Sequence, residues 1–279
     1  MVGGAWHSCA VNVQLPEVEA SGLSVSTLRK AIRARGCLIV RGLLPPADAD
    51  RLQRLADPVF AAREEHVQGA PLEATAPLYV PSAEWTAETA MAEAFRAFGD
   101  RVGALHIADT PRFLDELLTV LSATTLFGTI SAYLDEPVVL SAQKTMLRRV
   151  PPDAKPTFHQ DGSFMGPATQ AVNTWVALSH CGDGCDAPGL GIVPRRFDTS
   201  LNGYHAAVKP YEDEEWEAAI AGVGVVYPTF APGDALMFDG LLVHGNGGGR
   251  PGLSSSRYAI EMWTFAREGV PAGYGAIAI

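Results

Sequence analysis

The sequence lacks the features of a secreted, membrane-spanning or nucleic-acid-binding protein. Only 4 of its 279 residues are cysteines, and it contains no run of about eighteen apolar residues that would span a membrane. The start, Met-Val-Gly-Gly-Ala-Trp-His, has neither the basic flank nor the apolar stretch of a signal peptide. Lys and Arg number 21 against 31 Asp and Glu, which argues against a basic face for nucleic acid. We therefore expect a cytoplasmic protein without a nucleic-acid or membrane partner.

Cysteines at close spacing are limited to one pair, Cys181 and Cys185. A structural zinc site would need two further ligands at similar spacing, and only His180 is near. We therefore expect reduced thiols, as is usual for a cytosolic protein.

The first part of the chain has the periodicity of helices. Apolar residues recur at helical spacing between Ser24 and Gly36, a serine and a glycine that suit the two ends of a helix. Further helices are expected from Pro46 and after Pro111, and a short buried strand at 37–40.

From about residue 138 the chain has short apolar runs separated by Gly, Pro and Asp. These runs are 138–140, 174–178, 190–193, 223–227, 235–238 and 258–265. The pattern is typical of an antiparallel sandwich or barrel. Since no linker divides the chain, we expect a single α+β domain over 1–279, with helices over about 20–130 packed around a β core over about 138–266.

Three residues have the composition of a metal site. His159 and Asp161 are two apart, and in an extended segment such residues point to the same side. His244 ends an apolar run and precedes a glycine-rich stretch, 245–249, for which we expect no regular structure. Taken singly, the first motif also fits a surface turn, and His244 also fits a hydrogen-bonded core histidine.

Together, two histidines and one carboxylate make the facial triad of non-haem Fe(II) oxygenases. Three ligands on one face of the ion leave three positions open, so a 2-oxo acid can take two of them and O2 the third. Arg257 begins a later apolar run. A guanidinium there can hold the distal carboxylate of 2-oxoglutarate through a bidentate pair. A surface arginine on an edge strand is the alternative reading.

Short motifs follow one another in a fixed order over most of the chain. They are 36–44, 145–147, 151–153, 159–162, Trp175, 189–194, 232–234, His244 and Arg257. In this order they resemble the phytanoyl-CoA dioxygenase (PhyH-like) family of Fe(II)/2-oxoglutarate oxygenases. The resemblance implies a double-stranded β-helix, the jelly roll also found in cupins, with N-terminal and flanking helices.

The resemblance also implies roles for individual residues. The metal ligands, which are also the catalytic residues, would be His159, Asp161 and His244. The contacts to 2-oxoglutarate would be Arg257, Met146, Trp175 and Asn246. Trp175 also fits a core position, and Asn246 stands where relatives often have a serine. We expect Gln143 and Lys144, on the same segment as Met146, to face the substrate pocket.

The implied reaction uses Fe(II), 2-oxoglutarate and O2 to oxidise a small molecule, with succinate and CO2 as coproducts. Hydroxylation is the expected outcome, and desaturation, ring closure and epimerisation remain open. The carboxylate of Asp161 argues against halogenation, because related halogenases have a small residue there. We prefer a free amino acid or an intermediate of secondary metabolism as substrate over a CoA thioester or a carrier-bound group.

The sequence leaves two other readings open. One is a cupin-like metalloenzyme that uses the triad without 2-oxoglutarate, and its activity would survive Arg257→Ala. The other is a non-catalytic relative that binds a ligand or partner, which would hold no iron. Relatives commonly have Pro-Gly-Ser-His where this chain has Pro-Arg-Arg-Phe at 194–197, so the conformation of this loop is open as well.

Overall fold

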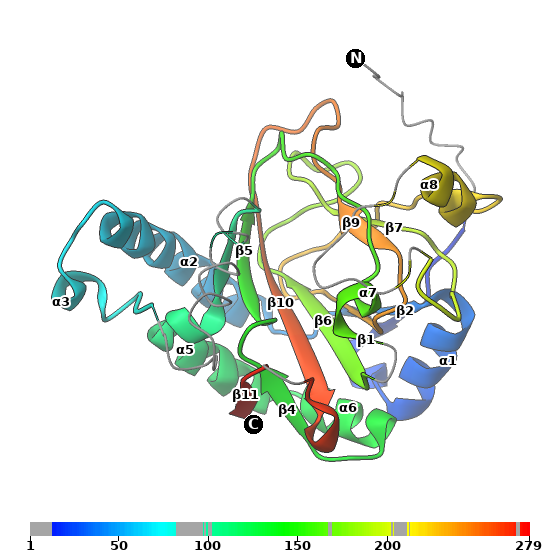
Figure 1. Cartoon of the computed structure of the whole chain (residues 1–279), viewed down its shortest axis with the longest axis horizontal. Coiled ribbons are helices and arrows are strands. Elements are labelled where there is room, and N and C mark those ends of the chain that lie inside the picture. The colour runs from blue at the N-terminus through cyan, green and yellow to red at the C-terminus, as the bar shows by residue number, and fades with distance from the viewer. Residues whose placement is uncertain are drawn as a thin grey trace.

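The structure, a computed structural model, describes residues 13–81, 97, 99, 102–166, 169–201, 203, 211, 213–271 and 274–279. Its α-helices are α1 Val25–Arg35, α2 Pro46–Val67, α3 Leu72–Thr75, α5 Pro111–Ser122, α6 Leu126–Leu134, α7 Gly162–Met165 and α8 Asp213–Ile220. Its strands are β1 Glu17–Glu19, β2 Cys37–Arg41, β3 Ala104–His106, β4 Val138–Ser141, β5 Met146–Val150, β6 Ala171–Ala177, β7 Leu190–Ile192, β8 Ala235–Phe238, β9 His244–Asn246, β10 Arg257–Ala266 and β11 Ala276–Ala278. Figure 1 shows their arrangement.

The main sheet is organised around β10, its longest strand (Figure 1). The sheet order is β1-β2-β8-β6-β10-β4-β11, and β5 pairs with β10 and with β3 beside this path. All pairings are antiparallel except β1 with β2. Along β10, Glu261 lies opposite both Trp175 of β6 and Met146 of β5. This register decides which side chains of three strands share one face.

A smaller layer lies beside this sheet. It consists of β7 paired with β9, and it is widened by isolated bridges from His159 to His244 and from Ile192 to Val226. A cavity of about 220 Å³ is lined by residues of β5, β6, β8 and β10 together with residues of β9 and Leu190 of β7. The two layers therefore face each other across the cavity.

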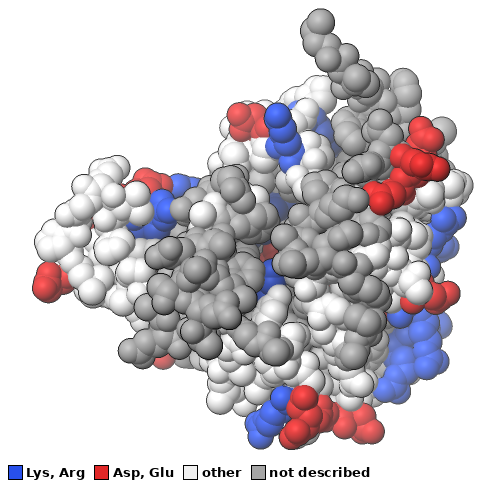
Figure 2. Space-filling view, viewed as in Figure 1, with Lys and Arg blue, Asp and Glu red and all other residues white. Residues whose placement is uncertain are grey.

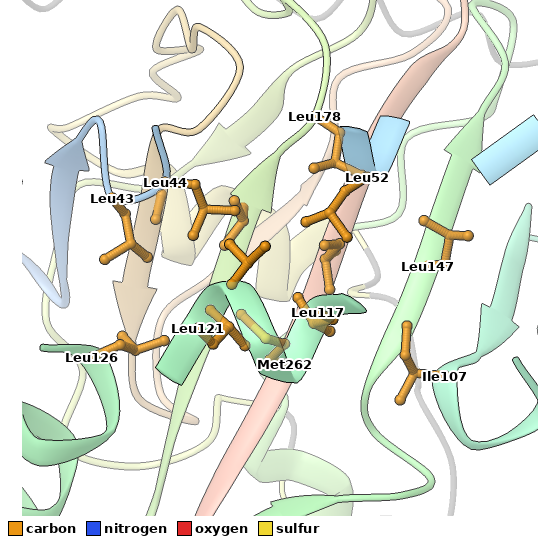
Figure 3. Packing of buried hydrophobic residues seen from close by; sticks show 14 of the residues in the cluster. Leu43, Leu44, Leu52, Ile107, Leu117, Leu121, Leu126, Leu147, Leu178 and Met262 are labelled. Atoms are coloured by element: carbon orange, nitrogen blue, oxygen red, sulfur yellow. The ribbon is translucent and has the colours of Figure 1, made fainter. Parts of the chain in front are cut away.

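Helices cover the other face of the main sheet. The buried side chains of α1, α2, α5 and α6 join alternate residues of the strands in one apolar cluster, which includes Leu52, Leu117 and Leu121 of the helices and Leu147 and Met262 of the strands (Figure 3). No described helix alone is long and apolar enough to cross a membrane; α5 and α6 pass that test only as a pair bent by 76°.

The strongest sequence signals for helices are confirmed. In α1, Ser24 and Thr27 form a capping box, and Gly36 ends the helix with a left-handed φ of 82°. The helices expected from Pro46 and after Pro111 are α2 and α5, and the strand expected at 37–40 is β2. Residues 82–96 of the expected helical part lie outside the described residues.

Two expectations for the β core are wrong. The run 223–227 is no strand, because Gly222 and Gly224 on either side of Val223 adopt φ of 74° and 63°, and within the run only Val226 forms a β-bridge, with Ile192. The glycine-rich stretch after His244 is partly regular, since Gly245 and Asn246 belong to β9. A Cβ on Gly245 would lie 2.6 Å from the carbonyl oxygen of Thr157, so this glycine allows β9 and the segment that precedes His159 to approach closely.

Candidate metal centre

The structure brings the three expected ligands together in the wall of the cavity. Nε2 of His159 lies 3.1 Å from one carboxylate oxygen of Asp161, and Nε2 of His244 lies 3.6 Å from the other. The ligand atoms of the three residues all lie within 4.8 Å of one another. They are the only such group of His, Cys, Asp or Glu residues in the part of the chain that the structure describes.

The backbone fixes the two histidines relative to each other. His159 and His244 form an antiparallel bridge, with N–H to carbonyl distances of 3.0 and 3.1 Å in the two directions. Their ring centroids are 4.7 Å apart. The bridge joins the segment before α7 to β9, so residues far apart in sequence present their imidazoles side by side.

Asp161 reaches the site by a turn and not by an extended backbone, so the expected strand geometry of the motif is wrong. Its φ of −66° and ψ of −29° are helical, and it directly precedes α7. Gly162 N–H donates to the carbonyl of Gly240 at 2.7 Å, and a Cβ on Gly162 would lie 2.8 Å from that oxygen. This close contact bends the chain and turns the carboxylate back toward His159.

Hydrogen bonds on the far side of each imidazole leave Nε2 facing the site. Nδ1 of His159 lies 3.2 Å from the carbonyl of Thr157, and Nδ1 of His244 lies 3.2 Å from the carbonyl of Leu242. Because a carbonyl only accepts, Nδ1 carries the proton in both rings, and in a neutral ring Nε2 then has a lone pair for a metal. Asn173 Nδ2 donates to Asp161 at 3.5 Å, which orients the carboxylate.

Burial and charge set the ionisation of the three groups. Burial alone would raise the pKa of Asp161, but the two histidines and Lys144 outweigh it and hold that pKa at about 2. Burial lowers the pKa of His244, which favours the neutral ligand form. For His159, burial acts in the same direction, but the contact with Asp161 raises its pKa above the usual value. Binding of a metal at His159 would therefore compete with a proton.

Arg257 is buried at the cavity wall, so the reading as a surface arginine is wrong. Only 2% of its surface is exposed, and Nη1 donates to the carbonyl of Gly189 at 2.7 Å and to that of Pro188 at 3.4 Å. The guanidinium lies 5.4 Å from the ring centre of Trp175. Its Nε is buried and has no hydrogen-bond partner among the described residues. Burial lowers its pKa to about 10, so it stays charged at neutral pH.

The loop that carries Pro188 and Gly189 is fixed against the start of β10. Backbone N–H groups of Ser254 and Ser255 donate to the carbonyl of Asp186 at 2.8 and 3.0 Å, and the Ser255 hydroxyl donates to its carboxylate at 2.8 Å. These bonds hold the two carbonyls that Arg257 contacts.

Among the described cysteines, Cys37, Cys181 and Cys185 are free thiols, and Cys9 lies outside the described residues.

The other residues expected at the site divide into two groups. Met146, Trp175, Asn246 and Lys144 line the cavity. The structure places Gln143 elsewhere, since it is not a lining residue and its Oε1 accepts a hydrogen bond of 2.6 Å from Gly275 N–H. Both ends of the Asn246 amide are engaged as well: Nδ2 donates to the carbonyl of Lys155 at 2.9 Å, and Oδ1 accepts from Gly248 N–H at 3.1 Å.

Sequence reasoning missed two charged residues in the cavity. Arg148 and Glu261 both line it and form an ion pair of 2.8 Å, with side chains 16% and 20% exposed. Once β5 and β10 are known as strands, alternation places both residues on the cavity side, because Arg148 is two residues from Met146 and Glu261 is four from Arg257. Figure 2 shows a hollow on this face of the molecule with charged atoms of both signs at its bottom.

Gln160, between two of the expected ligands, is a further residue whose role the motif did not reveal. It is fully buried, and its Oε1 accepts from Leu201 N–H at 2.8 Å and from the Tyr211 hydroxyl at 2.7 Å. Its Nε2 donates to the carbonyl of Leu241 at 2.7 Å. It therefore ties the metal motif to the loops behind it.

Known proteins resemble this chain in structure. No family model and no curated protein matches its sequence. The crystal structure of AviO1 from Streptomyces viridochromogenes Tue57 is 20% identical with a TM-score of 0.56, and the match covers 90% of this chain and 98% of AviO1. The crystal structure of EctD from S. alaskensis with 2-oxoglutarate and 5-hydroxyectoine is 17% identical with a TM-score of 0.60, covering 89% and 79%. A second EctD structure contains bound Fe. These similarities confirm the resemblance at the level of the fold.

Proposed function

We propose that the chain is an Fe(II)- and 2-oxoglutarate-dependent dioxygenase of the PhyH-like family, built on a double-stranded β-helix. One observation carries the proposal: a single cavity is lined by two imidazoles and a carboxylate whose ligand atoms lie within 4.8 Å of one another and by a buried arginine with an unpartnered Nε. The EctD structures with Fe and with 2-oxoglutarate support it through the shared fold. The smaller layer with its two bridges, facing the main sheet, supports the β-helix.

The residues present fit both the metal and the cosubstrate. His159, Asp161 and His244 offer two nitrogen ligands and one oxygen ligand and leave the cavity side open, as an Fe(II) oxygenase requires. Arg257 would hold the distal carboxylate of 2-oxoglutarate through the free side of its guanidinium. When bound, iron and 2-oxoglutarate would supply the chemistry that oxidises a substrate C–H bond, with succinate and CO2 as coproducts.

The remaining residues orient these groups and keep water away. The carbonyls of Thr157 and Leu242 fix the imidazoles, since each accepts the Nδ1 proton. The ring of Phe238 lies 4.6 Å from that of His244 and gives the site an apolar wall. Trp175, at the Arg257 end, covers the guanidinium. Met146 completes the wall on the β5 side.

The substrate in this proposal is a small organic molecule, with a free amino acid or an intermediate of secondary metabolism preferred, and hydroxylation is the expected reaction. Nucleic acid and membranes are not partners in this proposal, and a cytoplasmic location is part of it. The buried arginine favours a 2-oxoglutarate enzyme over a cupin-like enzyme without this cosubstrate, because an unpartnered guanidinium nitrogen is costly unless an anion meets it.

The test is the visible spectrum of the chain with Fe(II) and 2-oxoglutarate in the absence of oxygen. We expect a weak metal-to-ligand charge-transfer band that is lost in His159→Ala. In Arg257→Ala the band should need on the order of 30-fold or more 2-oxoglutarate, the effect of removing one partner of a buried charge pair. Arg267→Ala, at an exposed arginine outside the cavity, is the matched control. Iron binding without a band would support the cupin-like alternative, and no iron binding would support a non-catalytic protein.

A further inference from the structure

Glu261 is a carboxylate in the cavity wall to which the proposed function gives no role. It lies on β10, on the same side of the strand as Arg257. The residues opposite it, Met146 of β5 and Trp175 of β6, line the same cavity and carry no charge. The side chain of Glu261 is only 20% exposed, so an acidic group lies largely buried in the space that a substrate would enter.

The charge of Glu261 acts on two parts of the candidate site. Burial is the main influence on the pKa of His244 and on that of Arg257, and it lowers both. The negative charge of Glu261 acts in the opposite direction on both groups. Glu261 therefore interacts electrostatically with an expected metal ligand and with the arginine expected to hold 2-oxoglutarate, as a residue beside the reacting part of a substrate would.

Arg148 holds one oxygen of this carboxylate and leaves the other open to the cavity. Its Nη1 donates to Oε2 of Glu261 at 2.8 Å, and its Nη2 donates to the carbonyl of Val102 at 3.4 Å. Among the described residues, no other group donates a hydrogen bond to the Glu261 side chain, so Oε1 accepts none from them. The protein thus orients the carboxylate but satisfies only one of its two oxygens.

The free oxygen Oε1 favours a ligand group that donates hydrogen bonds and carries a positive charge. A largely buried carboxylate loses hydration, and an oxygen without a donor adds to that cost. Hydrogen bonds between charged groups are about twice as strong as those between neutral groups. An ammonium should therefore bind Oε1 more strongly than a hydroxyl does. An ionised carboxylate only accepts hydrogen bonds, so a carbonyl or a second carboxylate has no favourable contact there.

We propose that Glu261 is the substrate anchor, and that the substrate is a small molecule with a protonated amino group that donates to Oε1 of Glu261. This proposal rests on the proposed function, since it places the amine in the same cavity as iron and 2-oxoglutarate. It selects amines and amino acids over neutral compounds and simple carboxylic acids. Arg148 is a positioning residue, because it holds Oε2 and so leaves Oε1 for the ligand.

The experiment compares amines with the corresponding alcohols, which have nearly the same shape and also donate a hydrogen bond but carry no charge on that group. The pairs are cyclohexylamine and cyclohexanol, 2-phenylethylamine and 2-phenylethanol, and 4-aminobutanoate and 4-hydroxybutanoate. Each compound is titrated at neutral pH into the anaerobic complex with Fe(II) and 2-oxoglutarate, and the heat of binding is recorded together with the charge-transfer band. We expect the amine of a pair to bind at least about tenfold more tightly than the alcohol.

Variants of the ion pair test whether Glu261 causes this preference. Glu261→Gln keeps the shape of the side chain and removes its charge, so the preference should vanish. Because this change also leaves Arg148 without its counter-charge, the double variant Arg148→Gln/Glu261→Gln is measured beside it and should show no preference either. Where Glu261→Gln does not fold, the double variant alone decides. Glu268→Gln, at an exposed glutamate outside the cavity, is the matched control and should keep the preference.

The outcomes separate this proposal from the proposed function. If the wild-type chain shows the band but binds no amine, or binds amines and alcohols equally, the anchor is overturned and the oxygenase assignment stays intact. The same holds if the preference survives Glu261→Gln or returns in the double variant. Absence of the band would overturn the assignment itself. In that case the same pairs are titrated into the chain without metal, and equal binding there would overturn the anchor as well.

Discussion

The two faces of the main sheet are made by the same strands and have opposite characters. On the helix face, Leu147, Val176 and Met262 belong to one apolar cluster and are fully buried. On the cavity face, Arg148, Trp175 and Glu261 alternate with them along the same three strands. Successive side chains of a strand point to opposite sides. A single register therefore places the apolar residues that stabilise the fold on one face and the residues that line the cavity on the other.

On the cavity face, polar side chains lie next to a largely buried cavity and therefore need hydrogen-bond or ion-pair partners. Polar side chains there have defined partners: Arg148 with Glu261, Asn173 with Asp161, and Arg257 through Nη1 with the carbonyl of Gly189. Nε of Arg257 has no partner among the described residues. Apolar packing on the helix face stabilises the fold without specifying any reaction. A shift of one residue in the register of β10 would exchange the two faces, so the tightly packed helix face also secures the site.

The largest expected effect comes from removing a ligand on the cavity side. His244→Ala should abolish stoichiometric Fe(II) binding, with affinity falling by more than about 100-fold, since even partners of metal ligands contribute on the order of 10- to 100-fold. Iron content after anaerobic gel filtration measures this. His66→Ala, at a histidine of α2 outside the cavity, should retain the metal, and equal loss in both variants would contradict the assignment.

The matching change on the helix face should affect stability and not the metal. Met262→Ala removes a fully buried side chain from the apolar cluster, and we expect the free energy of unfolding to fall by about 2–5 kcal/mol. Urea denaturation measures the loss. Iron stoichiometry of the folded variant should stay at the wild-type value, and a loss of iron from the folded variant would show that the two faces are not separable in function.

The pH dependence of stability should locate a charge effect on the cavity face. The folded pKa of Asp161, about 2, lies below its usual value of 3.8. Its ionised form therefore stabilises the metal-free chain above about pH 4, and this contribution is lost as the pH falls through about 2. We expect a contribution of about 2 kcal/mol, measured as the difference between wild type and Asp161→Asn in urea denaturation at pH 5 and pH 2.5. A difference that does not change with pH would contradict the lowered pKa.

The smallest expected effect concerns Asn246 at the edge of the cavity. Because both ends of its amide are engaged by the backbone of Lys155 and Gly248, we expect Asn246→Ala to change the affinity for 2-oxoglutarate by less than about threefold, within roughly 0.7 kcal/mol. Titration of the charge-transfer band measures it. A loss comparable to that of Arg257→Ala would show that the amide turns toward the cosubstrate, as the family resemblance implies.

Much of the candidate site could be predicted from short motifs, because the residue types that bind metals have few substitutes. His159, Asp161 and His244 converge as expected, and Arg257 lies on the same cavity. The backbone conformation at Asp161 could not be predicted, since the turn depends on the close contact of Gly162 with Gly240, a residue distant in sequence. The strand at Gly245 could not be predicted either, because a glycine is compatible with irregular structure and also with the close packing of two backbone segments.

The charged part of the cavity depends on strand register, which the sequence does not reveal. β5 contains two adjacent arginines, Arg148 and Arg149. They interrupt the alternation of apolar and polar residues by which a strand is recognised in a sequence. Only pairing with β10 shows that Arg148 meets Glu261 inside the cavity, while Arg149 reaches Glu64 of α2 outside it. Gln143 was expected in the pocket and instead binds Gly275 near β11, a strand that the sequence did not predict.

The most direct test of the central claim is a crystal structure grown without oxygen in the presence of Mn(II) and 2-oxoglutarate. The proposed function predicts one metal ion bound by Nε2 of His159, the carboxylate of Asp161 and Nε2 of His244, with the distal carboxylate of 2-oxoglutarate on Arg257. A metal ion at any other place, or 2-oxoglutarate bound away from Arg257, would contradict the claim that this cavity is the active site of a 2-oxoglutarate oxygenase.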